Sequence, residues 1–241
     1  MQTIEQICKR LVSSTEKCHL GFPHSGWGHN PTLSELEPLV RRIIEISYKY
    51  KTGHLSSNLT ALPILYRLCQ DKDAKTVLSA GHMGIALYSI LEAFEGKDAE
   101  GLYAKHGTHP NRDIANGIYC SSGSLGLGMS IAAGMAWARP QSHINCLISD
   151  GECAEGIVWE VLRITCDMPI DNISIVVNAN GSSAIDLVNI NNLYDRLVAF
   201  NPNVIIFKTP RELFGVLDGI EEHYHVLTDD EYRLLEGGNN A

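Results

Sequence analysis

Apolar runs separated by amphipathic segments extend along most of the chain. Four short, continuously apolar runs predict buried strands, at 76–80, 143–149, 172–178 and 203–207. Apolar positions at helical spacing predict helices over 33–52, 59–70, 82–96, 129–138, 154–167 and 193–200. Strands that are apolar on both faces and alternate with helices are typical of a parallel sheet flanked by helices on both faces. The pattern therefore predicts an α/β fold.

Polar and glycine residues mark several boundaries of these elements. Thr32 and Glu35 match a capping box, which predicts a helix start at residue 33, and Gly53 is expected to break that helix. Gly96 is expected to close the helix over 82–96. The stretch 101–122 lacks a periodic pattern and is expected to be irregular. Because ligands of parallel sheets lie at the carboxyl ends of strands, the turns after the first three predicted strands should share one crevice.

Composition and charge restrict the possible functions. The 241 residues are 44% hydrophobic and carry a formal charge of −9, which favours one domain or a tightly fused pair and opposes non-specific nucleic-acid binding. Any phosphate is then expected to be held by a metal ion or by backbone amides. The seven cysteines form no Cys-x-x-Cys pair and the amino terminus carries no apolar signal region. Both observations favour a cytoplasmic protein with reduced thiols.

A glycine-rich turn, SSGSLGLG at 121–128, precedes the predicted helix over 129–138. Glycines before a helix can aim backbone amides at a phosphate or a cofactor ring. A dinucleotide-binding fingerprint would need a third glycine where this chain has Ile131. Taken alone, the turn fits a ligand-binding loop and simple tight packing of a helix against the sheet equally well.

Carboxylate and amide side chains follow two of the predicted strands. Asp150 lies in SDGECAEG, directly after the strand over 143–149, and Asn180 lies in NANG, after the next strand. Adjacent strand ends would place two hard oxygen ligands side by side, which suits Mg²⁺ completed by phosphate and water oxygens. The alternative is that Asp150 caps the following helix and that Asn180 and Gly181 form an ordinary turn.

SDGECAEG followed at this spacing by NANG resembles the thiamine-diphosphate motif, and other segments extend the likeness. Six segments, in chain order, resemble the amino-terminal, cofactor-binding half of transketolase: KTGHLSS, TVLSAGHMGIALYSIL, HGTHP, SSGSLGLGMSIAAGMA, DGECAEGIVWE and LYDRLVAFNPNVI. The likeness covers residues 39–206. It implies the thiamine-diphosphate-binding fold, with a diphosphate-type domain over 32–241. A helix and a loop rich in Gly, His and Pro would precede this domain, at 1–31.

The resemblance also implies which residues serve the site. Mg²⁺ would be bound by Asp150, Asn180 and the backbone carbonyl of Ser182. The cofactor-binding residues would be His82, Gly123, Ser124, Leu125, Gly151, Glu152 and Asn180. Within this set Gly151 would let the diphosphate approach, and 123–125 match the loop whose backbone lies against the aminopyrimidine ring. Glu155 matches a catalytic glutamate that reaches across the interface between subunits. Glu152 itself is expected to be solvated or to cap a helix.

Three histidines match pocket residues of the family and are predicted to be catalytic: His54, His82 and His109. In transketolases the matching residues contact the diphosphate and the hydroxyl groups of the sugar donor and acceptor. Neutral imidazoles can donate or accept the protons that such transfers require. His223, before TDDEY, is a fourth candidate by the same likeness.

The chain also departs from the family's pattern. Leu55 and Ser56 stand where the family has Pro and Gly, Leu127 replaces a Gln, and Ser149 replaces the first Gly of the metal motif. None of these changes removes a ligand. The segment 203–232 lacks a strand and a Lys-Gly-rich loop of the family, so part of the active-site lid is expected to be absent or supplied otherwise.

The likeness implies the amino-terminal subunit of a split transketolase. The family's activating glutamate lies in a pyrimidine-binding domain, which is expected on a separate carboxyl-terminal subunit in a heterotetramer of two plus two subunits. The pair would transfer a two-carbon ketol unit from a ketose or ketose phosphate to an aldehyde, with thiamine diphosphate and Mg²⁺ or another small divalent cation. One alternative is the same chemistry on a non-standard substrate of a specialised pathway. The other is a non-catalytic scaffold subunit, against which the retained Asp150, Asn180, Glu155 and three histidines argue.

Overall fold

A five-stranded sheet organises the chain in the computed structural model, which describes residues 2–15, 18–19, 25–168, 170–183, 186–211, 213–214 and 220–237. The strands are β1 (Cys18–His19), β2 (Lys75–Leu78), β3 (Ile144–Ser149), β4 (Ile173–Ala179) and β5 (Ile205–Lys208). Their order in the sheet is β1-β5-β4-β3-β2. β2 to β5 are parallel, whereas β1 runs antiparallel to β5 at the edge. The four predicted strands are all present.

Helices follow each of the inner strands, as the α/β pattern predicts. The α-helices are α1 (Ile4–Thr15), α2 (Leu33–Lys49), α3 (Leu55–Cys69), α4 (Gly84–Glu95), α5 (Ala99–His106), α6 (Leu127–Ala138), α7 (Gly156–Asp167), α8 (Ile190–Phe200), α9 (Ile220–Tyr224) and α10 (Asp229–Gly237). Short 3-10 helices are η1 (Gly81–Met83), η2 (Ile114–Asn116) and η3 (Gly151–Ala154). In the part of the chain that is described, no helix is both long and apolar enough to cross a lipid bilayer.

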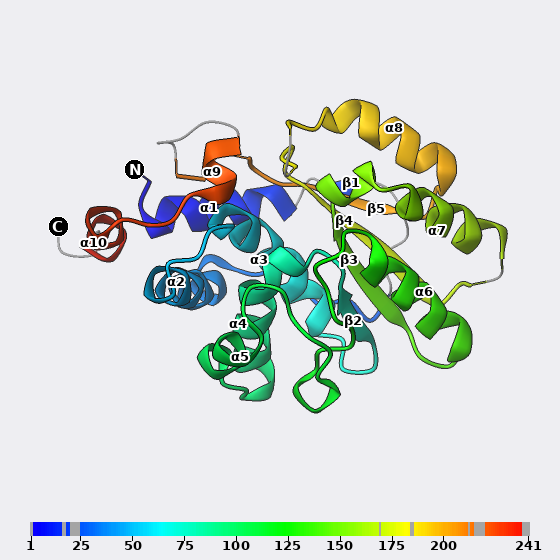
Figure 1. Cartoon of the computed structure of the whole chain (residues 1–241), viewed down its shortest axis with the longest axis horizontal. Helices are drawn as coiled ribbons and strands as arrows, with labels where there is room; N and C mark the ends of the chain where they lie inside the picture. Colours follow the sequence, from blue (N-terminus) through cyan, green and yellow to red (C-terminus); the bar gives the residue numbers. More distant parts are fainter. Residues whose placement is uncertain are drawn as a thin grey trace.

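The sheet separates two helical layers, and alternate strand residues point into each. Leu147 and Val176 pack with α1 to α5 in one core, while Cys146 and Ile175, each one position earlier, pack with α6 to α8 in the other. This period of two follows from the alternation of side chains along a strand. Figure 1 shows α2 to α5 on one side of the sheet and α6 and α7 on the other. The predicted cover on both faces is confirmed.

Two of the differences from the predicted helices have a clear cause in local contacts. α3 begins at Leu55, four residues before the predicted start, because buried contacts of Ser56, Ser57 and Asn58 outweigh their weak helix propensity. α5 occupies the beginning of the stretch that was expected to be irregular. Its N-cap Asp98 accepts the amide hydrogen of Gly101 at 2.9 Å, and a Cβ atom at 101 would lie 2.4 Å from that carboxylate. The glycine that interrupts the helical pattern is therefore the residue that permits the cap.

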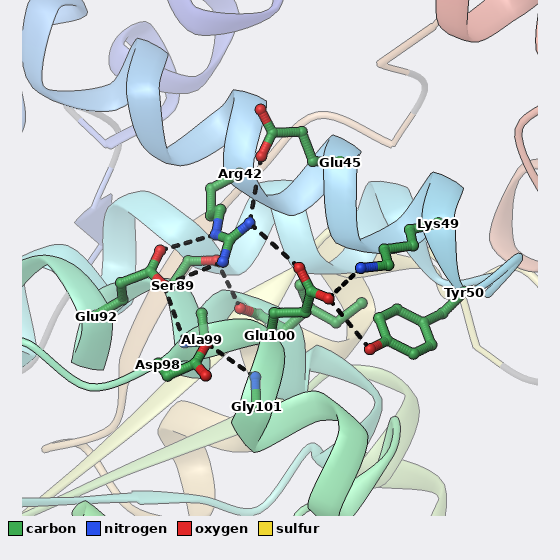
Figure 2. A network of polar contacts seen from close by, with 11 residues as sticks. Arg42, Glu45, Lys49, Tyr50, Ser89, Glu92, Asp98, Ala99, Glu100 and Gly101 are labelled. Atoms are coloured by element: carbon green, nitrogen blue, oxygen red, sulfur yellow. Dashed lines mark hydrogen bonds and ion pairs between the residues drawn. The ribbon is translucent and has the colours of Figure 1, made fainter.

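A network of ion pairs joins α2, α4 and α5 at the surface (Figure 2). The guanidinium of Arg42 donates from Nε to Glu92 at 2.8 Å and from Nη2 to the other oxygen at 3.1 Å. Glu45 and Glu100 approach the same guanidinium, and Lys49 pairs with Glu100. The network fixes three helices of one layer, on elements distinct from those that carry Asp150.

Candidate active site

Side chains that follow β3 connect the carboxyl ends of three strands. Asp150 accepts the amide hydrogen of Gly151 at 3.0 Å and, through Oδ2, that of Gly181 after β4 at 2.6 Å. Glu152 accepts the hydroxyl hydrogen of Ser79, the residue after β2, at 2.6 Å. The expectation that these strand ends lie together is therefore confirmed, and direct hydrogen bonds join them.

Asp150 is a buried carboxylate that only amides stabilise. The residue is 2% exposed, and burial raises its pKa to about 7 although hydrogen bonds from backbone amides lower it. Among the described residues, no Lys or Arg contributes to that pKa. A buried carboxylate costs free energy unless a positive charge compensates it, and a bound divalent cation provides that charge. The side chain therefore fits a metal ligand.

The turn after β4 carries two further oxygen atoms that could bind a cation. Asn180 is 6% exposed and its Oδ1 accepts the amide hydrogen of Ser182 at 3.0 Å. The carbonyl oxygen of Ser182 lies 3.6 Å, and the Cα atom of Ser183 3.2 Å, from the position that a Cβ atom on Gly151 would occupy. A side chain at 151 would crowd the turn after β4, so the glycine permits the close approach of the two turns.

The cap-and-turn interpretation of the same residues accounts for only part of these contacts. Asp150 does cap η3 through Gly151, and Gly181 adopts a turn conformation with φ of +82°. A cap needs neither a second amide from another strand nor burial of the charge. A cavity of about 240 Å³ is open beside Asp150 and Gly151 and is lined also by Ser183, Asn189 and Arg196. The space and the buried charge favour a ligand site.

Three imidazoles form a cluster near the amino end of α3. His54 Nδ1 and His223 Nε2 share a hydrogen bond of 3.1 Å, and the ring of His82 lies 5.2 Å from that of His54 and 5.7 Å from that of His223, between centroids. The backbone amide of His54 donates to the His223 carbonyl at 3.0 Å. The structure thus brings the fourth candidate, His223, into direct contact with two of the three predicted histidines.

Burial keeps these imidazoles neutral. Burial first, and then repulsion from neighbouring histidines, lowers the pKa of His54 to about 4 and that of His82 to about 3. Burial also lowers the pKa of His223. A neutral imidazole carries one donor and one acceptor nitrogen, so the His54–His223 bond uses one nitrogen of each ring. The Nδ1 atom of His223 lies 3.4 Å from the Ser57 hydroxyl. His54 Nε2 then lies outside this chain of hydrogen bonds.

Asn58 holds the histidine segments together, and the sequence did not reveal this role. It is fully buried, and its Nδ2 donates to the carbonyl oxygens of His54 at 2.9 Å and His82 at 3.0 Å. Its Oδ1 accepts the amide hydrogen of Ala86 at 2.9 Å. In the sequence Asn58 begins a glycosylation-type NLT triplet, and no local pattern distinguishes an asparagine that joins its own helix start to a segment 24 residues away.

The third predicted histidine lies between the cluster and the glycine-rich turn. His109 is exposed, and its charged form would repel those of His54 and His82. A Cβ atom on Gly81 would lie 3.0 Å from the His109 ring, and one on Gly123 would lie 3.7 Å from the Cβ atom of His109. The predicted ring-facing residues of the turn are all exposed: Gly123, Ser124 and Leu125.

Two glutamates of the motif have opposite environments. Glu155 is exposed at the N-cap of α7. Glu152 is fully buried, so the expectation that it is solvated is wrong. Its carboxylate accepts the amide hydrogen of Gly126, the N-cap residue of α6, at 2.8 Å. The other expectation, a helix-capping role, holds for α6 rather than for the helix that follows Glu152.

Tyr224 is a further residue of the site that sequence analysis did not identify. Its ring packs edge-on against His54 at 5.4 Å and His223 at 4.8 Å between centroids, and 48% of the residue is exposed. Its carbonyl oxygen lies 3.0 Å from where a Cβ atom on Gly53 would be. The segment 223–224 therefore packs on the entry to α3 and borders the imidazole cluster.

Comparisons with known proteins lead to one family. The chain is 29% identical over 191 residues to one of the subunits of the apulose-4-phosphate transketolase of Phocaeicola vulgatus, covering 68% of each chain. It is 30% identical over 150 residues to the 6-deoxy-6-sulfo-D-fructose transketolase subunit SqwG of a Clostridium species, covering 52% of this chain and 54% of the relative. It is also 30% identical over 163 residues to the Mycoplasma genitalium transketolase, of which it covers only 25%. No family model matches the chain.

Solved structures agree on the fold. The chain superimposes on a transketolase variant from Pichia stipitis with a TM-score of 0.65 and on the Campylobacter jejuni transketolase with a TM-score of 0.63. Sequence identity is 16% and 17%; each match covers 98% of this chain but only 40% and 43% of the longer protein. The chain has the α/β fold of these enzymes and spans less than half of their length. The family resemblance inferred from the motifs is confirmed.

Proposed function

We propose that this chain, as a relative of the transketolases, is the amino-terminal subunit of a split transketolase-like transferase. With a carboxyl-terminal partner it would bind Mg²⁺ and thiamine diphosphate and transfer a two-carbon ketol unit from a ketose or ketose phosphate to an aldehyde. One observation carries the proposal. The buried Asp150 carboxylate bonds to the turn after β4 beside a cavity that Gly151 also lines, with amides but no cation of the described residues to compensate it.

The metal site would consist of three oxygen ligands of this chain. Asp150, Asn180 and the backbone carbonyl of Ser182 would hold Mg²⁺, and the lack of a side chain at Gly151 would let a diphosphate approach. Hard oxygen ligands with room for phosphate oxygens suit this cation. When bound, thiamine diphosphate supplies the electron-accepting group that allows a carbon–carbon bond next to a carbonyl to break and form.

The imidazole cluster would donate protons to the substrates and accept protons from them. Because burial keeps His54 and His82 neutral well below neutral pH, each can donate from one ring nitrogen and accept at the other. The bond between His54 and His223 fixes the orientation of the His54 ring. His54 Nε2 would then accept from or donate to a sugar hydroxyl, and the exposed His109 would contact the same substrate beside the glycine-rich turn.

A second polypeptide would complete the site. The relative from Phocaeicola vulgatus is named as one of the subunits of its enzyme, and this chain covers a minor part of the undivided transketolases. We assign the partner a pyrimidine-binding domain with the activating glutamate, in an assembly of two plus two subunits. The exposed Glu155 at the start of α7 would face that glutamate.

A reconstituted pair tests this function. Titration calorimetry with thiamine diphosphate and Mg²⁺ should detect binding to the wild-type pair, and Asp150→Ala should abolish it. Asp113→Ala, which removes an acid from a surface loop, is the matched control and should retain binding. Absence of binding to the wild-type pair would refute the proposal. Binding without ketol transfer from any donor of a sugar panel would indicate the scaffold alternative.

A second candidate function is the same ketol transfer on the substrates of a specialised pathway. The relatives from Phocaeicola vulgatus and Clostridium are named for apulose-4-phosphate and for 6-deoxy-6-sulfo-D-fructose, which are not the same sugar. Tyr224 borders the imidazole cluster, and Leu55 and Ser56 begin α3 directly after His54. A donor panel that includes both named sugars, assayed with the reconstituted pair, separates this candidate from a transketolase of common sugar phosphates.

A further inference from the structure

Glu152 connects three separate segments of the candidate site through one carboxylate. Its Oε1 accepts the hydroxyl hydrogen of Ser79 after β2 at 2.6 Å and the amide hydrogen of Gly126 at 2.8 Å. Its Oε2 accepts the amide hydrogen of Ser149, the last residue of β3, at 2.9 Å. The ends of two strands and the N-cap of α6 are therefore held at fixed distances from each other.

Keeping this carboxylate in the interior is costly. Glu152 is fully buried, where a carboxylate loses its contact with water. The groups that favour its charged form are hydroxyls and amides, with no Lys or Arg among those in the described part of the chain. The amide of Gly126 lies at the positive end of α6, and a helix N-terminus attracts negative charge. The carboxylate thus acts directly on the position of the glycine-rich turn.

The turn is confined on its other sides as well. Gly126 has a φ of +80°, and a Cβ atom there would lie 2.6 Å from the Cγ2 atom of Ile157 on α7. A Cβ atom on Gly128 would lie 2.5 Å from the Cα atom of Ser79. Glu152 contacts the same turn through the Gly126 amide. Gly123 and Ser124, at the beginning of the turn, stay exposed.

We propose that Glu152 is a positioning residue that holds the backbone of 123–126 in the conformation that receives the aromatic ring of the cofactor. The inference rests on the proposed function, since it concerns the ring-facing turn of the same site. Glu152 would touch neither metal nor substrate, because it acts through the Gly126 amide. A turn fixed before binding needs no ordering when the ligand arrives, which raises the affinity for the ligand.

The test compares Glu152→Gln with two control variants. Glu152→Gln keeps the size of the side chain but replaces one acceptor oxygen by a donor that faces an amide or hydroxyl hydrogen. Ser79→Ala removes one hydroxyl donor to the same oxygen and leaves the Gly126 bond. Leu197→Ala removes a fully buried side chain of α8 in the same core and lowers stability without a contact to the turn.

Two measurements decide the inference. In the chain without ligand, hydrogen exchange of the Gly126 amide should accelerate by about tenfold or more in Glu152→Gln but not in Leu197→Ala, beyond the change in global stability. In the reconstituted pair with Mg²⁺, the Kd for thiamine diphosphate should rise by about tenfold or more in Glu152→Gln. Ser79→Ala should give a smaller rise, and Leu197→Ala should stay within about twofold of wild type.

The possible outcomes separate this inference from the proposed function. If the wild-type pair binds thiamine diphosphate and Glu152→Gln binds it with the same Kd, the inference is wrong and the proposed function stands. An unchanged exchange rate at Gly126 in Glu152→Gln also overturns it. If the wild-type pair does not bind the cofactor, the proposed function fails and the inference fails with it. Since glutamine preserves volume, loss of binding with a folded circular dichroism spectrum supports the positioning role.

Discussion

The Oδ2 atom of Asp150, directly after β3, accepts the amide hydrogen of Gly181, after β4, at 2.6 Å. A carboxylate from one strand end is thereby held at the turn of its neighbour, and the residue is 2% exposed. Burial of this charge destabilises the folded chain and is expected where the carboxylate binds a ligand. The site and the stability of the chain are therefore coupled through one side chain.

Replacing Asp150 by Asn should separate stability from binding. The amide keeps one acceptor oxygen and removes the buried charge, so the free energy of unfolding without ligand should fall by no more than about 1 kcal/mol. Binding of thiamine diphosphate with Mg²⁺ to the reconstituted pair should weaken by about a hundredfold, because a neutral amide is a poor ligand for a divalent cation. Urea unfolding and titration calorimetry measure the two effects.

Asp113→Asn is the matched control for that variant. Asp113 accepts from Lys105 at 2.7 Å and from Asn116 at 2.8 Å, and these contacts lower its pKa. The substitution should lower stability and leave the Kd of the cofactor unchanged. If Asp150→Asn instead binds the cofactor as tightly as wild type, the assignment of the metal ligand is wrong.

Acidification should destabilise the chain through its buried histidines. Burial lowers the pKa of His54 to about 4 and that of His82 to about 3, so between these values and about 6.5 the unfolded chain binds more protons than the folded chain. Their contribution to stability is present above pH 6.5 and is lost as the pH falls. His54→Gln should therefore lose less free energy of unfolding than wild type between pH 7 and pH 4.5.

The comparison with wild type is needed because another group changes stability in the opposite direction. Asp150, whose pKa burial raises to about 7, stabilises the folded chain more in its protonated form, so acidification below pH 7 favours folding at that residue. His54→Gln leaves this contribution in place. Parallel pH curves for wild type and His54→Gln, from urea unfolding without ligand, would show that His54 is not held neutral.

The ion-pair network of Figure 2 should stabilise the fold without affecting the site. Arg42 is 26% exposed in its side chain and makes a two-bond contact with Glu92, so Arg42→Ala should lower the free energy of unfolding by about 1 kcal/mol, and less at high salt. Arg163→Ala, which breaks an exposed pair with Asp167, should cost less. Urea unfolding at two salt concentrations measures this; a changed cofactor Kd in Arg42→Ala would contradict the separation.

Periodicity was sufficient to predict the four parallel strands and the positions of their ends, but not the antiparallel edge strand β1 (Cys18–His19), which lies in the stretch that was expected to be a loop. Each of the four apolar runs forms a parallel strand. The turns after neighbouring strands were expected to lie together, and the hydrogen bond from Gly181 to Asp150 joins two of them. A strand that is buried on both faces is apolar along its whole length, so its sequence is easily recognised. Once the parallel strands are predicted, the residues directly after them can be assigned to one edge of the sheet.

The contacts that arrange the site could not be predicted in the same way. Asn58 and Glu152 look like surface residues in the sequence, yet each is fully buried and bonds to segments far away in the chain. A buried polar residue is defined by partners that tertiary structure supplies, and a single sequence carries no trace of them. His223 could be proposed only by likeness to a family, and its bond to His54 spans 169 positions.

Two glycines of α6, one at its N-cap in the glycine-rich turn and one in its middle, should respond in opposite ways to substitution by alanine. Gly126→Ala places a Cβ atom 2.6 Å from Ile157 at a residue with φ of +80°, whereas a Cβ atom on Gly134, in the middle of α6, meets no atom within 4 Å. Gly134→Ala should stabilise the chain by about 0.5–1 kcal/mol, because alanine is the better helix former. Gly126→Ala should destabilise it by about 1–3 kcal/mol through the left-handed conformation and the clash.

The same pair also tests whether the position of the turn determines cofactor binding. The clash at 126 must displace the amide that Glu152 accepts, so Gly126→Ala should raise the Kd for thiamine diphosphate in the reconstituted pair by about tenfold. Gly134→Ala changes stability without moving the turn and should retain the wild-type Kd. Thermal unfolding of the chain alone and calorimetry of the pair measure the two quantities separately. Equal affinities for both variants would mean that the turn adapts to the cofactor after binding, and that its conformation in the free chain is not what the site requires.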